Sequence, residues 1–206
     1  MMSPIAIVAA AVGLIFCRFT SNLHNKQEAT LATLNAAIAA LERRVGFSAS
    51  RARLVGRHLR EQGLLPAGAP GIAPDLDLDD FVTLVIALAA DVPLHQSADA
   101  VRAYRNLTPG GADVSRAPAS VPRTAGEEID AIFSLASDGN SDVRGVKLEF
   151  VANWPEVAAH WHDGSISRFR ELGALAAHWG AAGHRRSTTV NMAALADAIN
   201  ETFTGA

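Results

Sequence analysis

Hydrophobic residues in the first half of the chain recur at steps of three and four, which is the spacing of one face of an α-helix. Leucine, isoleucine and valine form such a stripe between residues 26 and 45, and the alanines between them favour helix. Gly46 ends the stripe, and Ser48 or Ser50 is placed to cap a second helix that runs to Gln62. The pattern therefore predicts two consecutive helices joined by a short turn.

Two more helices are expected before residue 108. The loop "AGAPGIAP" precedes Asp77 and Asp80, which have the spacing of a capping pair for a helix through Ala90. This helix is hydrophobic on nearly all sides, so we expect it to be buried in the core or, if a single chain leaves a stripe of it bare, against a second copy of the chain. We therefore expect a homo-oligomer. A shorter helix is expected over residues 97–107.

The second half of the chain changes period. After a helix over residues 127–137, Val146, Leu148 and Phe150 alternate with polar residues, which indicates a strand. The dipeptide at residues 163–164, Asp-Gly, is typical of a hairpin turn. A last strand at residues 188–190 and a closing helix through residue 203 complete the pattern.

These elements predict two modules. A mainly α-helical module with a helix-turn-helix occupies residues 26–108, and a small α+β module with a β-hairpin occupies residues 126–204. Prolines and glycines in residues 109–125 indicate a linker between them.

The N-terminal residues allow several interpretations. Residues 5–17 are uninterrupted hydrophobic sequence, but about 20 Å of helix is too short for a hydrocarbon core of roughly 30 Å. No basic residue precedes this run, and no small-residue cleavage site follows it. Residues 1–24 could be a dispensable leader, a misassigned start, a weak membrane anchor through residues 5–19, a packed helix or a true signal. We expect a cytoplasmic protein, with membrane association through residues 5–19 left open.

The charged residues favour nucleic-acid binding in one segment of the chain only. The 206 residues carry a formal net charge of -3, which argues against coating nucleic acid through bulk charge. Six arginines nevertheless lie between Glu42 and Glu61. The single cysteine excludes an intramolecular disulfide and a thiolate zinc site.

The order of the arginines along the expected second helix suits contacts with DNA. Its register places Val55 and Leu59 inward, and predicts that Arg51, Arg53, Arg57 and Arg60 form one exposed ridge. Serines and arginine at the start of the helix would reach base edges, and the later arginines would contact phosphates. The residues expected to contact DNA are Arg43, Arg44, Ser48, Ser50, Arg51, Arg53, Arg57, His58 and Arg60.

The run "RVGFSASRARLVGRHLREQGLLP" resembles the recognition segment of winged-helix and related helix-turn-helix regulators. The order of this run, a Pro/Gly loop and a hydrophobic helix is also similar to small DNA-binding proteins of bacterial phages and prophages, over about a quarter of the chain. The chain departs from the pattern at Glu42, where alanine is common, and at "AGAPGIAP", which replaces the wing hairpin. The resemblance implies a double-stranded DNA-binding protein that acts as a transcriptional regulator or a phage-type recognition factor.

The sequence gives weaker evidence for a metal site or for catalytic residues. His160 and His162 lie two apart on an expected strand and, with Asp163 and a distant His178 or His184, could hold zinc, but their spacing is unconstrained. Acidic pairs at residues 127–128 and 75–80 are interpreted as helix-start charges. We therefore expect no enzyme activity, metal or cofactor. The alternative to DNA binding is a structural or interaction protein, with or without a membrane tether through its N-terminal hydrophobic segment.

Overall fold

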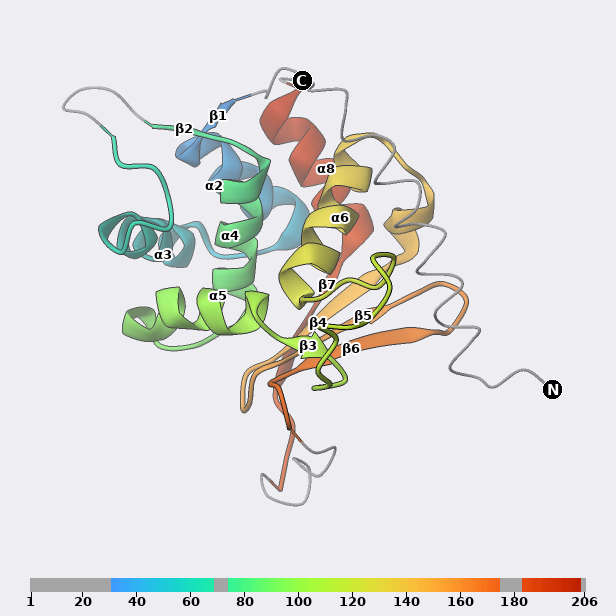
Figure 1. Ribbon diagram of the computed structural model, residues 1–206. Helices are drawn as coiled ribbons and strands as arrows, with labels where there is room; N and C mark the ends of the chain where they lie inside the picture. Colours follow the sequence, from blue (N-terminus) through green and yellow to red (C-terminus); the bar gives the residue numbers. More distant parts are fainter. Residues whose placement is uncertain (1–30, 69–73, 175–182, 205–206) are drawn as a thin grey trace.

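The computed structural model describes residues 31–68, 74–174 and 183–204, and within them the chain combines six α-helices with a five-stranded antiparallel sheet. Figure 1 shows the helices gathered on one side of the sheet. The first elements are β1 (Ala32–Thr33), α2 (Leu34–Val45), α3 (Ala49–Glu61), β2 (Asp75–Leu76), α4 (Leu78–Ala89), the 3-10 turn η1 (Leu94–Gln96) and α5 (Ser97–Arg105). The later elements are β3 (Thr108–Pro109), α6 (Ala125–Ser137), the 3-10 turn η2 (Asp142–Gly145), β4 (Lys147–Val151), β5 (Glu156–His160), β6 (Ile166–Arg170), β7 (Ser187–Asn191) and α8 (Met192–Phe203).

Polar side chains define where the helices begin. Ser48 caps α3, and its hydroxyl accepts from the backbone N–H of Arg51. Asp77 and Asp80 form the capping box expected at the start of α4. Asn191 caps α8, and its side chain accepts from the backbone N–H of Ala193. Helices occur where the hydrophobic spacing predicted them, as α2, α3, α4, α5, α6 and α8. In the first predicted helix, residues 26–30 lie outside the described residues, and residues 32–33 form the short strand β1.

The sheet has the order β3-β6-β5-β4-β7, and each neighbouring pair is antiparallel. The turn between β5 and β6 contains Asp163 and Gly164, as expected, and Gly164 has a positive φ of 84° that suits glycine. Alternate residues face the helices, and these hydrophobic side chains enter the core: Leu148, Phe150, Val157, Phe169 and Val190. The remaining positions form the outer face of the sheet.

One hydrophobic cluster joins the first helices to the sheet. Phe81 of α4 contacts Phe133 of α6 and Phe203 of α8, with ring centroids 6.4 and 5.8 Å apart. Tyr104 of α5 packs edge-on against Phe150 of β4, with centroids 6.0 Å apart. Segments from both ends of the chain therefore share the same core, and α2 packs along α8.

Helix α4 is buried within a single chain. Every residue from Phe81 to Ala89 is buried, as the hydrophobic pattern predicts. The helix leaves no bare stripe, so the condition under which we expected it to form a dimer is not met.

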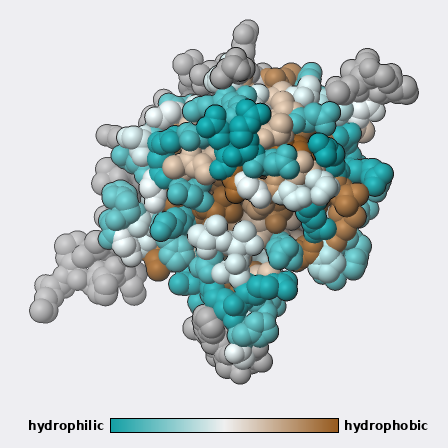
Figure 2. All heavy atoms as spheres, turned by 180° about the vertical axis from the view of Figure 1, so that it is seen from behind, coloured by the Kyte–Doolittle hydropathy of each residue, from teal (hydrophilic) through white to brown (hydrophobic). Residues whose placement is uncertain are grey.

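Figure 2 shows the opposite face of the molecule, where hydrophilic side chains surround a few hydrophobic ones near the middle of the view.

Candidate functional site

The α2–α3 segment is the candidate site that the sequence points to. Helix α2 ends at Gly46, whose left-handed backbone (φ 87°) lets its N–H reach the carbonyls of Leu41 and Glu42. The Glu42 carboxylate accepts from the backbone N–H of Ala49 at 3.1 Å, which ties the start of α3 to the preceding helix. Glu42, the position where the chain departs from the resembling proteins, therefore acts as a second cap.

Helix α3 has one buried and one exposed face. Val55 and Leu59 are fully buried, as predicted, together with three small residues: Ala49, Ala52 and Gly56. Gly56 meets the side chain of Leu34, and a Cβ there would lie 3.1 Å from a Leu34 methyl carbon. The exposed face consists of Ser50, Arg53, Leu54, Arg57 and Glu61.

The expected ridge of four arginines is only partly present. Successive residues of a helix are rotated by about 100°, which places Arg53 and Arg57 together but turns Arg51 to another flank. Arg51 is half-buried there, and its Nη2 donates to the backbone carbonyl of Val92. Arg60 is also half-buried, and its Nε is buried without a partner among the described residues. Two arginines of the four are thus exposed.

The arginines at the end of α2 are already paired. Arg43 Nη1 lies 2.8 Å from Oε1 of Glu201 in α8, and Arg44 Nε lies 2.8 Å from Oε2 of the same carboxylate. Glu201 therefore offsets part of the positive charge that we expected to brace a DNA backbone. His58 also has an acidic neighbour, because its Nδ1 lies 3.9 Å from Glu61.

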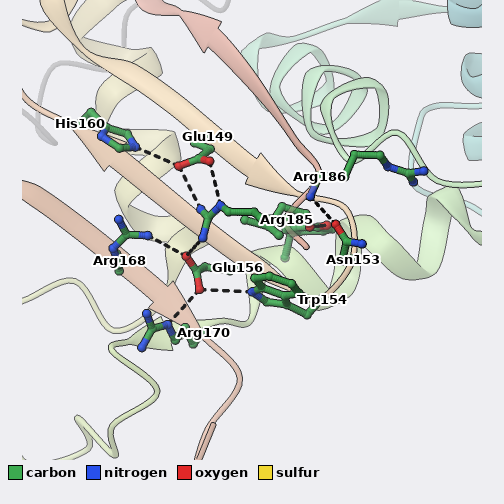
Figure 3. A network of polar contacts seen from close by, with 11 residues as sticks. Glu149, Asn153, Trp154, Glu156, His160, Arg168, Arg170, Arg185 and Arg186 are labelled. Carbon is green, nitrogen blue, oxygen red and sulfur yellow. Dashed lines mark hydrogen bonds and ion pairs between the residues drawn. The ribbon is translucent and has the colours of Figure 1, made fainter. Parts of the chain in front are cut away.

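A second polar cluster, which sequence analysis missed, occupies the outer face of the sheet (Figure 3). Glu156 of β5 lies at its centre, and its side chain is only 2% exposed. Its Oε1 accepts from Arg168 Nη1 at 2.8 Å and from Arg185 Nη1 at 2.9 Å. Its Oε2 accepts from Arg170 Nε at 3.0 Å and from Trp154 Nε1 at 3.3 Å. Four donors therefore surround one carboxylate.

Glu149 extends this cluster across β4. Its Oε1 accepts from Arg185 Nε at 3.0 Å, and His160 Nε2 lies 3.1 Å from its Oε2. The guanidinium carbon of Arg185 also lies 5.9 Å from the ring centroid of Trp154. Arg185 thus links the two glutamates and is the most buried of the three arginines, with 11% of its side chain exposed.

These contacts determine the ionisation of Glu156. Burial by itself raises the pKa of this carboxyl, but the hydrogen bonds from Arg185, Arg170 and Trp154 outweigh it and lower the pKa to about 2. The pKa of Glu149 is lowered as well. Burial raises this pKa, but the hydrogen bonds from Ser187, Arg185 and His160 lower it by more than burial raises it. Both carboxylates are ionised at neutral pH, so the cluster contains two negative charges and three guanidinium cations.

The two glutamates at the start of α6 have different surroundings. Glu127 accepts from the backbone N–H of Arg123 at 2.7 Å and is exposed, which agrees with a helix-start charge. Glu128 is instead 4% exposed, and its Oε1 has no partner among the described residues. Burial raises the pKa of Glu128 to about 7. Glu128 thus lies in the first turn of α6, as expected, but it is buried there, unlike Glu127.

The histidines do not come together in the described part of the chain. His160 contacts Glu149, and His184 Nε2 lies 3.1 Å from the side-chain amide of Asn153. His178 lies outside the described residues. No group of three metal-ligating side chains occurs within residues 31–68, 74–174 and 183–204.

No helix among the described residues is long and hydrophobic enough to cross a membrane. The hydrophobic segment at residues 5–19 lies outside them.

Comparisons with known proteins find no matching family model, no matching curated protein and no matching solved structure. The candidate function therefore depends on the geometry of the two arginine clusters.

Proposed function

We propose that the chain binds double-stranded DNA, with α2 and α3 as the two helices of a helix-turn-helix and α3 as the helix that meets the major groove. The observation that carries this proposal is the exposed face of α3. Arg53 and Arg57 lie four residues apart on it, and neither forms an ion pair with any described residue. Unpaired arginines one turn apart suit contacts with successive phosphates.

The buried face of α3 supports the same function. A helix that enters a groove must be held rigidly from behind, and Val55 and Leu59 anchor α3 in the core. Gly56 allows Leu34 of α2 to approach closely, which fixes the two helices against each other. The exposed face can then meet a duplex without a change in the fold.

The structure narrows the set of residues that we propose to contact DNA. Ser50, Arg53 and Arg57 are exposed on one face of α3, and Ser48 lies exposed at its N-terminus. Arg51 and Arg60 are half-buried, and Arg43 and Arg44 share Glu201. We therefore assign Arg53 and Arg57 as the main phosphate contacts, with Arg43 and Arg44 as weaker ones.

Salt dependence tests the proposal. Fluorescence anisotropy with a labelled random-sequence duplex, measured over a series of salt concentrations, gives the slope of log affinity against log salt. Arg53→Ala with Arg57→Ala should reduce the magnitude of that slope by about 1.8, because each lost phosphate contact removes about 0.9. The loss should be similar for all sequences, since phosphates carry no sequence information directly.

Arg116→Ala with Arg144→Ala is the matched control. Both arginines are exposed, both lie outside α2 and α3, and their removal lowers the net charge by the same amount. This control should keep the wild-type slope. If the wild type binds no duplex at low salt, or if the two double variants behave alike, the DNA proposal fails and an interaction protein becomes the better interpretation.

A further inference from the structure

We propose that the outer face of the sheet binds a phosphate group through the free guanidinium edges of Arg168 and Arg170, which Glu156 holds in place. This site lies on β5 and β6 and does not depend on DNA binding by α3.

The balance of charge is the first argument. Among the described side chains of the cluster, Arg168, Arg170 and Arg185 carry three positive charges and Glu149 and Glu156 carry two negative charges, which is an excess of one positive charge. Lys147 occupies the same face of the sheet, because its strand position pairs with His160 and alternates with the inward Leu148. An excess of cations around partly buried carboxylates favours a further anion.

The unused donors of the arginines are the second argument. Glu156 accepts only Nη1 of Arg168 and only Nε of Arg170, so each guanidinium keeps further N–H groups that contact no described side chain. Figure 3 shows both guanidinium groups on the same side of Glu156, away from Arg185 and Trp154. The side chains of Arg168 and Arg170 are 35% and 17% exposed, so an anion can reach them from solvent.

The rigidity of the cluster is the third argument. Arg168 and Arg170 rise from alternate positions of β6, and β6 is held between β3 and β5. Glu156 fixes one edge of each guanidinium at 2.8 and 3.0 Å. A ligand would therefore meet donors whose side-chain entropy is already lost, which strengthens binding.

The chemistry of these donors favours phosphate over carboxylate. Arginine forms paired hydrogen bonds with both groups, but a tetrahedral phosphate presents three or four oxygens and up to two charges. Two guanidinium groups that approach from different strand positions can each bind a different pair of those oxygens. Such a phosphate could belong to a phosphorylated small molecule or to the backbone of a nucleic acid.

Calorimetric titration of the full chain with pyrophosphate, at constant ionic strength, tests the proposal. The wild type should bind pyrophosphate more tightly than acetate. Arg168→Gln with Arg170→Gln should weaken pyrophosphate binding by about tenfold or more, since the charge-assisted hydrogen bonds of two guanidinium groups are lost. Arg116→Gln with Arg144→Gln, which removes two exposed arginines elsewhere, should leave the affinity unchanged.

Absence of pyrophosphate binding by the wild type would overturn the proposal, as would wild-type affinity in the Arg168/Arg170 variant. If that variant does not fold, Arg168→Lys replaces it, because lysine keeps the charge but cannot form paired hydrogen bonds. Arg168→Lys should weaken pyrophosphate binding severalfold, and an unchanged affinity would contradict the site.

A competition experiment distinguishes the two sources of the phosphate. Duplex DNA is added to the pyrophosphate complex of the Arg53→Ala/Arg57→Ala variant, in which α3 has lost its proposed contacts. Displacement of pyrophosphate would support a site for nucleic-acid backbone. Retention of pyrophosphate would support a site for a free phosphorylated molecule.

Discussion

The arginines of α3 and those of the outer sheet face differ in what surrounds them. Arg53 and Arg57 extend into solvent from a helix whose other face is buried, and no described carboxylate pairs with them. On the sheet, Arg170 and Arg185 lie largely covered, and both donate to the same buried glutamate. The helix arginines are thus held by no counter-charge among the described residues, whereas the sheet arginines are also fixed by a buried glutamate.

This difference determines whether the removal of an arginine changes the binding of a partner, the free energy of unfolding, or both. Exposed arginines contribute little to the free energy of unfolding, so their removal should change affinity alone. Arginines around a buried carboxylate contribute to both, because the removal of one partner leaves an uncompensated charge. Substitutions in α3 should therefore change binding alone, whereas substitutions in the sheet cluster should change both stability and binding.

The largest effect is expected for Glu156→Gln. This change removes the negative charge that three arginines share at 2.8 to 3.0 Å, and the side chain is almost fully buried. We expect a loss of about 3 to 5 kcal/mol in the free energy of unfolding, measured by urea denaturation at pH 7. Glu171→Gln, an exposed position directly after β6, should lose less than about 0.5 kcal/mol.

The loss in Glu156→Gln should depend on pH in a defined direction. The pKa of Glu156 falls from its ordinary value of 4.5 to about 2 in the folded chain, so the ionised carboxylate stabilises the fold above pH 4.5. That contribution disappears as the pH falls from about 4.5 to 2. An equal difference between variant and wild type at pH 7 and pH 3 would show that shape, and not charge, matters at this position.

Glu128→Gln should have a smaller effect of the opposite sign. Glu128 is also buried, but no arginine among the described residues pairs with it, and burial raises its pKa to about 7. A carboxyl whose pKa is raised by folding stabilises the fold below its ordinary pKa of 4.5, and that contribution is lost as the pH rises through 7. The variant should therefore be more stable than wild type at pH 8, by on the order of 2 kcal/mol.

Urea denaturation at pH 8 and pH 4.5 checks this expectation, and the difference should vanish at the lower pH. Glu127→Gln, on the exposed side of the same helix, is the control and should change little at either pH. A destabilised Glu128→Gln at pH 8 would mean that the carboxylate has a partner in the folded chain. It would also weaken the view that arginines are what keep Glu156 ionised.

The sequence predicted the two regions unequally, for a physical reason. The helix region depends on local rules, such as the three-to-four spacing, the turn at Gly46 and the cap at Ser48, and these were read correctly. The ridge of four arginines was not, although helical rotation alone separates Arg51 from Arg53 and Arg57. Only the backbone carbonyl that Arg51 binds, that of Val92 on a distant loop, had no signal in the sequence. The strand expected from the alternation at Val146, Leu148 and Phe150 and the strand expected at residues 188–190 correspond to β4 and β7, whereas β1, β2 and β3 were not predicted.

The sheet cluster had no local signal. Glu156 of β5 and Arg185, which lies just before β7, are far apart in the sequence. Only the strand order β6-β5-β4-β7 brings their strands near each other. Their meeting depends on the register of three strands, which hydrophobic alternation alone does not set. One hint was present in the sequence, because Arg168 and Arg170 alternate with Phe169 on a strand whose other face is hydrophobic. Arginines two apart on a strand share a face and could have been considered as a pair.

The smallest effect on stability is expected for Arg53→Ala and Arg57→Ala, the pair that should matter most for DNA. Both side chains are exposed and form no ion pair with a described residue, and alanine has a slightly higher helix propensity than arginine. The free energy of unfolding should therefore change by less than about 0.5 kcal/mol per substitution, measured by urea denaturation. Arg170→Ala provides the comparison on the sheet and should cost several times more, because it leaves Glu156 with one donor fewer. If the α3 substitutions prove as costly as Arg170→Ala, then Arg53 and Arg57 are held by the fold as the sheet arginines are. In that case the exposed face of α3 is not free to bind a duplex.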